Sequence, residues 1–173
     1  MNTSKTILVV EDEKSLNENL VEILKPLCDT VLSANNGVEA LALIKSSPNL
    51  CAISSDIMMP KMDGLELLKQ IRCDFNPIPF VILTGRGETK DYEQAIQLNA
   101  TDFLTKPLDP EAIITVMTRA ISYGSSLIEV ERKLDEIYRE SGLPNDKILE
   151  IKRAKRTVMA MRIESSLYYP KKA

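Results

Sequence analysis

The sequence predicts an α/β fold in which a parallel β-sheet is covered by helices on both faces. Short apolar runs rich in β-branched residues recur along the first two thirds of the chain, as in the strands of a buried sheet. Each run is followed by a segment whose apolar residues recur at intervals of three and four positions, as in amphipathic helices. This alternation of strand and helix implies right-handed crossovers between parallel strands.

Five strands are expected at the apolar runs, at residues 6–10, 30–34, 51–56, 80–84 and 101–104. Five helices are expected after them, at residues 15–27, 38–44, 65–71, 91–98 and 110–121. The residues between these segments are typical of turns, such as Asn36 and Gly37 after the second strand. Pro110 suits the first turn of the fifth helix, because a helix leaves the first backbone N–H groups without partners.

Composition indicates a globular, cytoplasmic chain. The 173 residues are 44% hydrophobic and 27% charged, enough for a substantial core. No apolar run approaches roughly 18 residues, so we expect no membrane-spanning helix, and the N-terminus lacks the apolar segment of a signal peptide. Cys28, Cys51 and Cys73 are widely spaced, which favours buried thiols in a reducing compartment. The chain has no histidine, which excludes a histidine triad or histidine metal cluster.

Four polar residues follow four of the expected strands. Asp12 follows the first strand, Asp56 ends the third, Thr84 ends the fourth and Lys106 follows the fifth. Ligands of open parallel sheets bind outside the carboxyl ends of the strands. We therefore expect these four residues to form one site.

The residue types at this site favour phosphoryl transfer. Glu11, Asp12 and Asp56 would raise one another's pKa unless a cation were bound, and such an oxygen-rich cluster suits Mg²⁺ or Mn²⁺. Lys106 and Thr84 can hold phosphoryl oxygens. Asp56 is the candidate phospho-acceptor, since carboxylates form aspartyl-phosphates and the reaction mainly needs positioning and charge neutralisation.

Other interpretations of these residues are weaker. An aspartate at the end of a strand is usually a helix cap, and Asp63 is a candidate cap for the helix that follows it. Phosphatases of the haloacid dehalogenase type need a second aspartate two residues after the nucleophile, where this chain has Met58. The sequence contains neither a GxxxxGK[ST] loop nor a GxGxxG motif, so no nucleotide-binding enzyme is indicated.

Four short motifs resemble those of one known family, in the same order and at similar spacing. They are ILVVEDE at residues 7–13, DIMMPKMDG at 56–64, LTG at 83–85 and FLTKP at 103–107. Over residues 1–123 the chain resembles the receiver domain of bacterial two-component response regulators, as in CheY-like proteins. The resemblance implies a flavodoxin-like, doubly wound sheet of strand order 2-1-3-4-5.

The resemblance also implies roles for individual residues. Asp56 would be phosphorylated by a sensor histidine kinase, and Lys106 would pair with the phosphoryl group across a cis bond to Pro107. Mg²⁺ would be held by Asp12, Asp56 and the backbone carbonyl of Met58, with Glu11 acting mainly through water.

Thr84 and Phe103 would form the switch pair of such a domain, and Met58 and Arg86 occupy positions that tune the phosphoryl lifetime in the family. Phosphorylation would change the face formed by the fourth helix, fifth strand and fifth helix. Such a chain is a signalling switch, whose only chemistry is its own phosphotransfer and dephosphorylation. The intact set of site residues argues against a receiver that has lost phosphorylation. Ser54 and Ser55 replace aliphatic residues that the family usually has, so looser packing of the central strand is expected there.

Residues 124–173 are expected to form a helical extension. Leu127, Val130, Leu134 and Ile137 recur at the spacing of a helix-packing seam. Gly142 and Pro144 end that helix, and a second helix is expected from residue 145 or 146 to about 167. We expect a helical hairpin that buries its apolar stripes against itself, the receiver domain or a second subunit. It would then transmit the signal by dimerisation or by binding another protein.

The extension is also basic, which leaves a second function open. From residue 143 onward, eight Lys or Arg and three Asp or Glu give a net charge of about +5, which leaves about −8 for the rest of the chain. Lys152, Lys155, Arg156 and Arg162 form a candidate contact surface for nucleic acid, since basic side chains bind phosphates independently of sequence.

Overall fold

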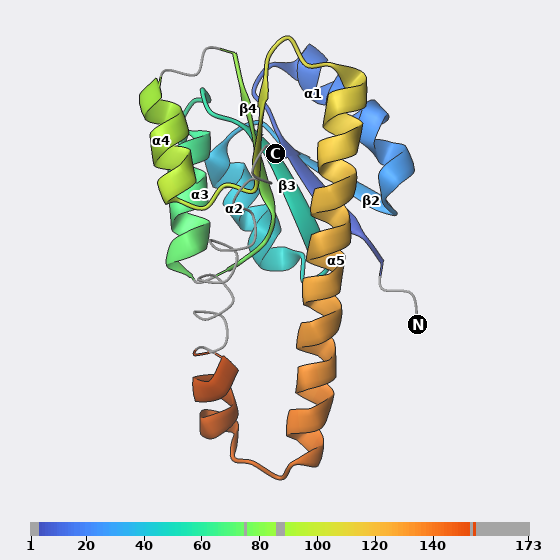
Figure 1. The fold of residues 1–173 in the computed structure, drawn as a ribbon, viewed down its shortest axis with the longest axis vertical. Helices are drawn as coiled ribbons and strands as arrows, with labels where there is room; N and C mark the ends of the chain where they lie inside the picture. The colour runs from blue at the N-terminus through green and yellow to red at the C-terminus, as the bar shows by residue number, and fades with distance from the viewer. Residues whose placement is uncertain (1–3, 75, 86–88, 153, 155–173) are drawn as a thin grey trace, which may run out of the picture.

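The structure is a computed structural model of the 173-residue chain, and it describes residues 4–74, 76–85, 89–152 and 154. Strands and helices alternate along the chain, as expected (Figure 1). The strands are β1 (Thr6–Val10), β2 (Thr30–Ala34), β3 (Leu50–Asp56), β4 (Phe80–Thr84) and β5 (Asp102–Thr105). The helices are α1 (Lys14–Leu24), the 3₁₀ turn η1 (Lys25–Leu27), α2 (Gly37–Ser46), α3 (Gly64–Cys73), α4 (Thr89–Gln97) and α5 (Pro110–Glu140).

The five strands form one parallel sheet of order β2-β1-β3-β4-β5, which confirms the flavodoxin-like topology. The central strand β3 pairs with β1 through Val10 and Ser55 and with β4 through Asp56 and Leu83. Because the strands are parallel and in register, their carboxyl ends meet at one edge of the sheet. Every residue of β3 is buried, including Ser54 and Ser55, so the serines do not expose the strand.

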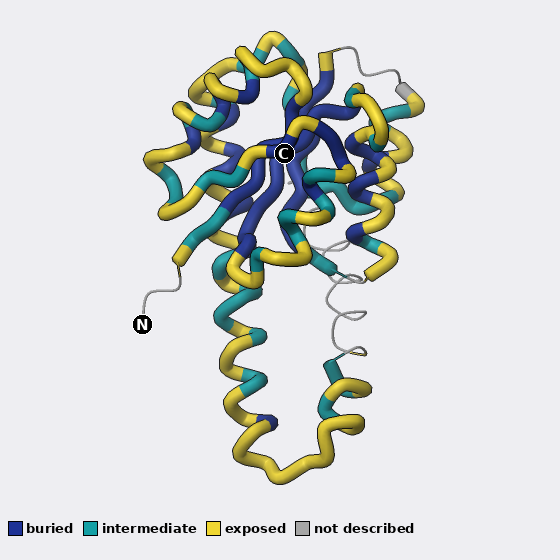
Figure 2. Tube along the Cα trace, turned by 180° about the vertical axis from the view of Figure 1, so that it is seen from behind, coloured by how far each residue is buried: buried dark blue, intermediate teal, exposed yellow. Residues whose placement is uncertain are grey.

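Each face of the sheet packs against its own set of helices. On one face, Leu8, Ile53 and Ile82 contact apolar residues of α2, α3 and α4. On the other face, Val9 and Val81 contact residues of α1 and α5. The alternation of side chains along each strand therefore builds two cores with the sheet between them. Figure 2 shows the buried residues gathered in the strands.

The cysteines only partly fit the sequence-based expectation. Cys51 is buried in β3, whereas Cys28 is half-buried and Cys73 is exposed at the last turn of α3. The expectation that all three thiols are buried is therefore wrong. All three are unpaired, as expected.

The helix α5 is the longest element, and it extends well beyond the sheet (Figure 1). It joins the helix expected from Pro110 with the apolar repeat expected further on, so the boundary at residue 123 lies within one helix. Gly124 lets α5 approach the start of β3, because a Cβ atom there would lie 1.7 Å from the carbonyl oxygen of Cys51. Glycine weakens an isolated helix, but at this position its lack of a side chain allows α5 to pack against the start of β3.

The chain turns at Gly142, whose φ of +66° suits glycine, and becomes helical again at residues 145–152 and 154. This second helix runs back alongside the end of α5 (Figure 1), and Lys152 Nζ lies 2.6 Å from Asp135 Oδ1. The two described helices are joined by a short turn as a hairpin, and the rest of the extension, for which a helix to about residue 167 is expected, lies outside the described residues. Within the described residues, no helix is both long and apolar enough to cross a membrane.

We predict that Gly124→Ala destabilises the fold by about 1–3 kcal/mol, the usual effect of overpacking, because the new methyl group must displace the β3 backbone. At an exposed helix position the same change would instead stabilise by about 1 kcal/mol. Urea unfolding measures the difference. Ser126→Ala, at an exposed position two residues further along α5, is the control and should stay within about 0.5 kcal/mol of wild type. Equal or greater stability of Gly124→Ala would contradict the close approach.

Candidate functional site

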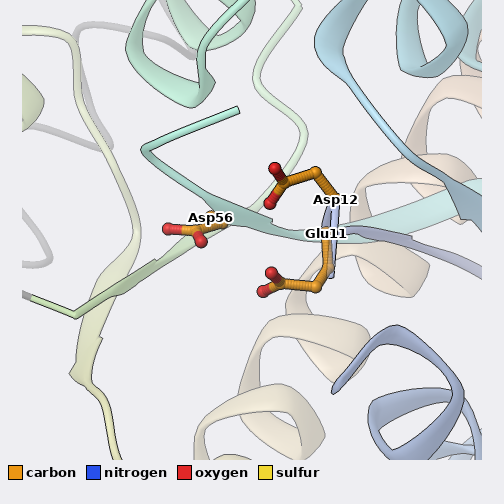
Figure 3. Close-up of side chains that lie close together, drawn as sticks. All are labelled: Glu11, Asp12 and Asp56. Carbon is orange, nitrogen blue, oxygen red and sulfur yellow. The ribbon is translucent and has the colours of Figure 1, made fainter. Parts of the chain in front are cut away.

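Three carboxylates meet at the carboxyl edge of the sheet. Glu11 and Asp12 follow β1, and Asp56 ends β3, which is the neighbouring strand. Each can offer one oxygen atom such that the three atoms lie within 4.8 Å of one another (Figure 3). The side chain of Glu11 is only 1% exposed and that of Asp56 10%, whereas Asp12 is exposed. The structure therefore brings together the acidic residues that the sequence analysis selected.

Lys106 lies between two of these carboxylates. Its Nζ atom donates to Asp56 Oδ2 at 2.6 Å and to Glu11 Oε2 at 2.7 Å. Burial alone would lower the pKa of Lys106, but the hydrogen bonds and charges of Asp56 and Glu11 outweigh burial and raise this pKa. The backbone N–H of Lys106 donates to the carbonyl of Thr84 at 2.7 Å, which fixes the start of the β5–α5 loop. The Lys106–Pro107 peptide bond is cis, as the family resemblance implies.

The charges of the site suit a divalent cation. Burial raises the pKa of Glu11, and the charge of Asp56 adds to this rise, while Lys106 opposes it. Three carboxylates and one ammonium group leave two negative charges uncompensated. Oxygen ligands and this net charge fit Mg²⁺ or Mn²⁺, which take carboxylates together with water and phosphate oxygens.

The β3–α3 loop closes the site on its other side. The backbone N–H of Met58 donates to Asp56 Oδ1 at 3.3 Å, and the Met58 side chain is exposed. Gly64 lets the start of α3 approach the strand, since a Cβ atom there would lie 2.1 Å from the Asp56 carbonyl oxygen. Asp63 caps α3 by accepting from the Glu66 N–H at 2.7 Å, as expected. The Met58 carbonyl thus belongs to a loop held at both ends beside Asp56.

Thr84 ends β4, and Phe103 lies in the neighbouring strand β5, where it pairs with Ile82. Thr84 is buried at the end of β4, and Phe103 is half-buried in β5. The ring of Phe103 packs on Tyr92 of α4 with their centroids 5.5 Å apart, and the Tyr92 hydroxyl lies 3.3 Å from Thr105 Oγ1. Tyr92 therefore links α4 to the strand that carries Phe103. Arg86, the other expected tuning residue, lies outside the described residues.

The sequence analysis missed Asn17 of α1. Its side-chain amide donates to the carbonyls of Glu11 at 2.9 Å and Ala34 at 3.2 Å, and its oxygen accepts from the Ser33 hydroxyl at 2.6 Å. Asn17 therefore ties α1 to the ends of β1 and β2 and fixes the backbone that carries the acidic pair. One sequence feature could have identified Asn17: it is a polar residue three positions before Leu20, on the apolar side of an amphipathic helix.

A groove of about 580 Å³ adjoins the site between α1 and the start of α5. Lys106 and Pro107 lie at one side of this groove, and Leu16, Leu20 and Ile113 supply apolar surface. The groove therefore presents apolar surface beside Lys106.

The chain matches the response regulator receiver domain family over residues 7–118. It is 33% identical over 166 residues to response regulator MprA of Mycobacterium ulcerans (strain Agy99), covering 95% of this chain and 70% of that protein. It is 32% identical over 151 residues to the probable transcriptional regulator ycf27 of Porphyra purpurea, covering 87% of this chain and 57% of that protein. The chain thus spans just over half the length of this curated relative.

Solved structures agree with the sequence matches. Chemotaxis protein CheY4 of Vibrio cholerae superposes with a TM-score of 0.62 at 28% identity, covering 68% of this chain and 98% of that structure. The signal receiver domain of an HD domain-containing protein from Pseudomonas fluorescens Pf-5 gives a TM-score of 0.68 at 26% identity, with 75% and 95% covered.

We predict that Glu11→Gln makes the metal-free protein more stable than wild type at neutral pH. Because the pKa of Glu11 is raised by folding, its charged form destabilises the fold at neutral pH, and this effect disappears as pH falls through the raised pKa. The stability difference between variant and wild type should therefore shrink by about pH 4. Chemical unfolding in a chelator, repeated across pH, measures it.

Added Mg²⁺ should then stabilise wild type more than Glu11→Gln, because the variant lacks one of the three carboxylates. The exposed neighbouring position provides the control: Glu13→Gln should leave both the pH profile and the Mg²⁺ response close to wild type. A Glu11→Gln protein that is less stable than wild type at neutral pH would contradict the electrostatic analysis.

Proposed function

Because the chain belongs to the response regulator receiver family, we propose that Asp56 is its phospho-acceptor and that a sensor histidine kinase supplies the phosphoryl group. Response regulators of two-component systems are partnered by histidine kinases. The observation that carries the proposal is the Asp56 carboxylate, which is held by Lys106 beside the Glu11–Asp12 pair at the rim of the sheet.

The arrangement supports in-line phosphoryl transfer. An Asp56 oxygen attacks the phosphorus atom, the bond from phosphorus to the donor histidine nitrogen breaks, and an aspartyl-phosphate forms. Lys106 then pairs with a phosphoryl oxygen, and the Thr84 hydroxyl donates to another. Asp12, Asp56 and the Met58 carbonyl would hold Mg²⁺ or Mn²⁺, with Glu11 acting through water, and the bound ion would neutralise charge on the transferred group.

Two features beside the site bear on how the phosphoryl group reaches Asp56 and on how long it stays there. The apolar groove beside Lys106 offers the kinase a surface close to Asp56. The exposed side chain of Met58 is placed to affect the approach of water to the aspartyl-phosphate. The unpaired cysteines support a cytoplasmic location, which we include in this proposal.

Phosphorylation would be transmitted through Thr84 and Phe103. When the Thr84 hydroxyl moves to the phosphoryl group, the space that it leaves allows Phe103 to repack, and Tyr92 of α4 must follow because the two rings are in contact. The α4–β5–α5 face then changes its affinity for a partner, through dimerisation or binding of another protein. The chain is a signalling protein rather than an enzyme that turns over a separate substrate.

We predict that incubation with acetyl phosphate and Mg²⁺ adds one phosphoryl group to wild type and none to Asp56→Asn. Intact-mass measurement detects the adduct directly. Asp63→Asn is the matched control, because it changes another aspartate of the same loop while asparagine can still cap α3. It should be phosphorylated like wild type. An adduct on Asp56→Asn, or none on wild type, would show that Asp56 is not the acceptor.

A second candidate function is nucleic-acid binding through the basic extension. Its support is that two relatives are named transcriptional regulators, ycf27 of Porphyra purpurea and a CpxR homolog of Haemophilus influenzae. Lys152 is half-buried and paired with Asp135, which reduces its availability to a phosphate backbone. Lys155, Arg156 and Arg162 lie outside the described residues.

If this second function holds, binding to duplex DNA or RNA should weaken steeply as salt rises, with a slope that reports the number of phosphate contacts. Lys155→Gln together with Arg156→Gln should reduce that slope by about 2. The control pair is Lys14→Gln with Lys25→Gln, two exposed lysines of the receiver, and it should leave the slope unchanged. Binding that is absent, or insensitive to salt, would exclude this function.

A further inference from the structure

We propose that a groove at the base of the receiver binds residues 155–159 of this chain's own extension, with Met159 in the groove and Lys155 paired with Glu131. The groove lies at the amino-terminal edge of the sheet, beside the first residue of β3, and Asp56 ends that strand at the opposite edge. This contact does not rest on the function proposed for Asp56. Residues 155–159 lie outside the described residues, whereas the groove and the helix that leads toward it are described.

The basal groove is the space between α5 and the loop that joins α3 to β4. Leu127, Ile128 and Glu131 of α5 line one side of it, and Pro77 and Ile78 of the loop line the other. Its volume of about 160 Å³ is enough for one large apolar side chain, since a cavity of about 150 Å³ can bind benzene. The groove therefore offers apolar side chains together with one acidic residue.

The groove continues a contact that already exists between α5 and the second helix, at residues 145–152. Lys152 Nζ lies 2.6 Å from Asp135 Oδ1, and Tyr138 is buried although this part of α5 extends beyond the sheet (Figure 1). On a helical wheel of about 100° per residue, Glu131 and Leu127 lie on the same side of α5 as Asp135. The side of α5 that the second helix follows therefore leads into the basal groove.

The chain beyond the second helix has the right length to reach this groove. Two antiparallel helices advance by the same rise, about 1.5 Å per residue. Met159 lies about 10 Å along a helix beyond Lys152, and Leu127 lies about 12 Å before Asp135. A continued second helix thus brings Met159 level with Leu127. The sequence has no glycine or proline from residue 145 to residue 169 that would end the helix earlier.

The charges of the two helices favour the same register. In steps of three and four residues, the side of the second helix that carries Lys152 passes through Lys155 and then Met159. On α5, Glu131 lies one turn before Asp135. Lys155 would therefore meet Glu131 as Lys152 meets Asp135, and Met159 would enter the groove one turn further on. Methionine suits such a position because its flexible side chain adapts to an irregular space.

This contact would hold the extension in one position against the receiver. It would also engage Lys155 within the chain, so that two of the four basic residues considered for nucleic-acid binding, Lys152 and Lys155, would be in ion pairs. If the extension does bind nucleic acid, phosphate groups would compete with Glu131 for Lys155. The docked extension is therefore the form that is less available to nucleic acid.

The test is disulfide trapping in the full chain, after replacement of the native cysteines by Cys28→Ser, Cys51→Ala and Cys73→Ser. Leu127→Cys with Met159→Cys places one thiol on each side of the contact. Ser126→Cys with Met159→Cys is the matched control, because residue 126 lies at the same level of α5 on its exposed side. We expect the first pair to form an intramolecular disulfide at least about tenfold faster than the control, since the two Cα atoms must lie within about 7 Å.

Urea unfolding shows that both proteins are folded before trapping, and in unfolding urea the two pairs should react at equal rates. Equal rates in the folded proteins overturn the contact, as does the absence of a disulfide in the first pair. A disulfide that joins two chains, seen as a covalent dimer on a non-reducing gel, also overturns it, because the groove would then hold the segment of a second copy.

Charge reversal tests the ion pair separately. Glu131→Lys should slow trapping of the first pair about fivefold, which is the scale of an exposed ion pair, and adding Lys155→Glu should restore the rate. A trapping rate that Glu131→Lys leaves unchanged, or that Lys155→Glu does not restore, overturns the pairing of Lys155 with Glu131. None of these measurements involves a phosphodonor, so their outcome is independent of whether Asp56 is phosphorylated.

Discussion

The interaction on which the site depends is the placement of one ammonium group between two buried carboxylates. Lys106 Nζ lies 2.6 Å from Asp56 Oδ2 and 2.7 Å from Glu11 Oε2, and removing one partner from a buried ion pair is strongly destabilising. Because Lys106 follows β5, Asp56 ends β3 and Glu11 follows β1, the contact exists only if these strands are parallel and share one edge. The order and register of the sheet are thus preconditions of the chemistry.

The positive charge of Lys106 compensates only part of the negative charge of the three carboxylates. Lys106 balances one of the three negative charges, so the folded chain keeps an acidic site whose oxygen ligands and net charge fit a divalent cation. The surrounding contacts hold the uncompensated charges in place. Asn17 fixes the backbone of the acidic pair, and Gly64 allows α3 to close on the carbonyl of Asp56. Local electrostatic instability at the site is tolerated because two buried cores stabilise the rest of the domain.

The sequence predicted the strands that depend on local patterns, but it did not predict contacts between residues that are distant in sequence. β1, β2 and β4 were placed to the residue, because continuous β-branched runs end at abrupt turn signals. Periodicity indicated parallel strands, and the polar residues at the strand ends predicted that Asp12 and Asp56 share one site, but the strand order that makes β1 and β3 neighbours came from the motifs of a known family. The role of Asn17 depends on carbonyls of two different strands, and the passage of α5 through Gly124 depends on a contact with Cys51. Neither partner is near in sequence, so no local pattern could reveal them.

The same helix that depends on Gly124 connects the two ends of the molecule. Its first half is held by the sheet, and Arg119 ties it to β5, the strand that carries Phe103. Its second half leaves the domain without a break, so a displacement beside β5 would be carried to the hairpin by a continuous helix and would not be absorbed by a linker. A flexible connection after residue 123 would let receiver and extension act independently. A continuous helix makes the position of one depend on the position of the other, and this continuity would give the proposed phosphorylation of Asp56 a physical route to the extension.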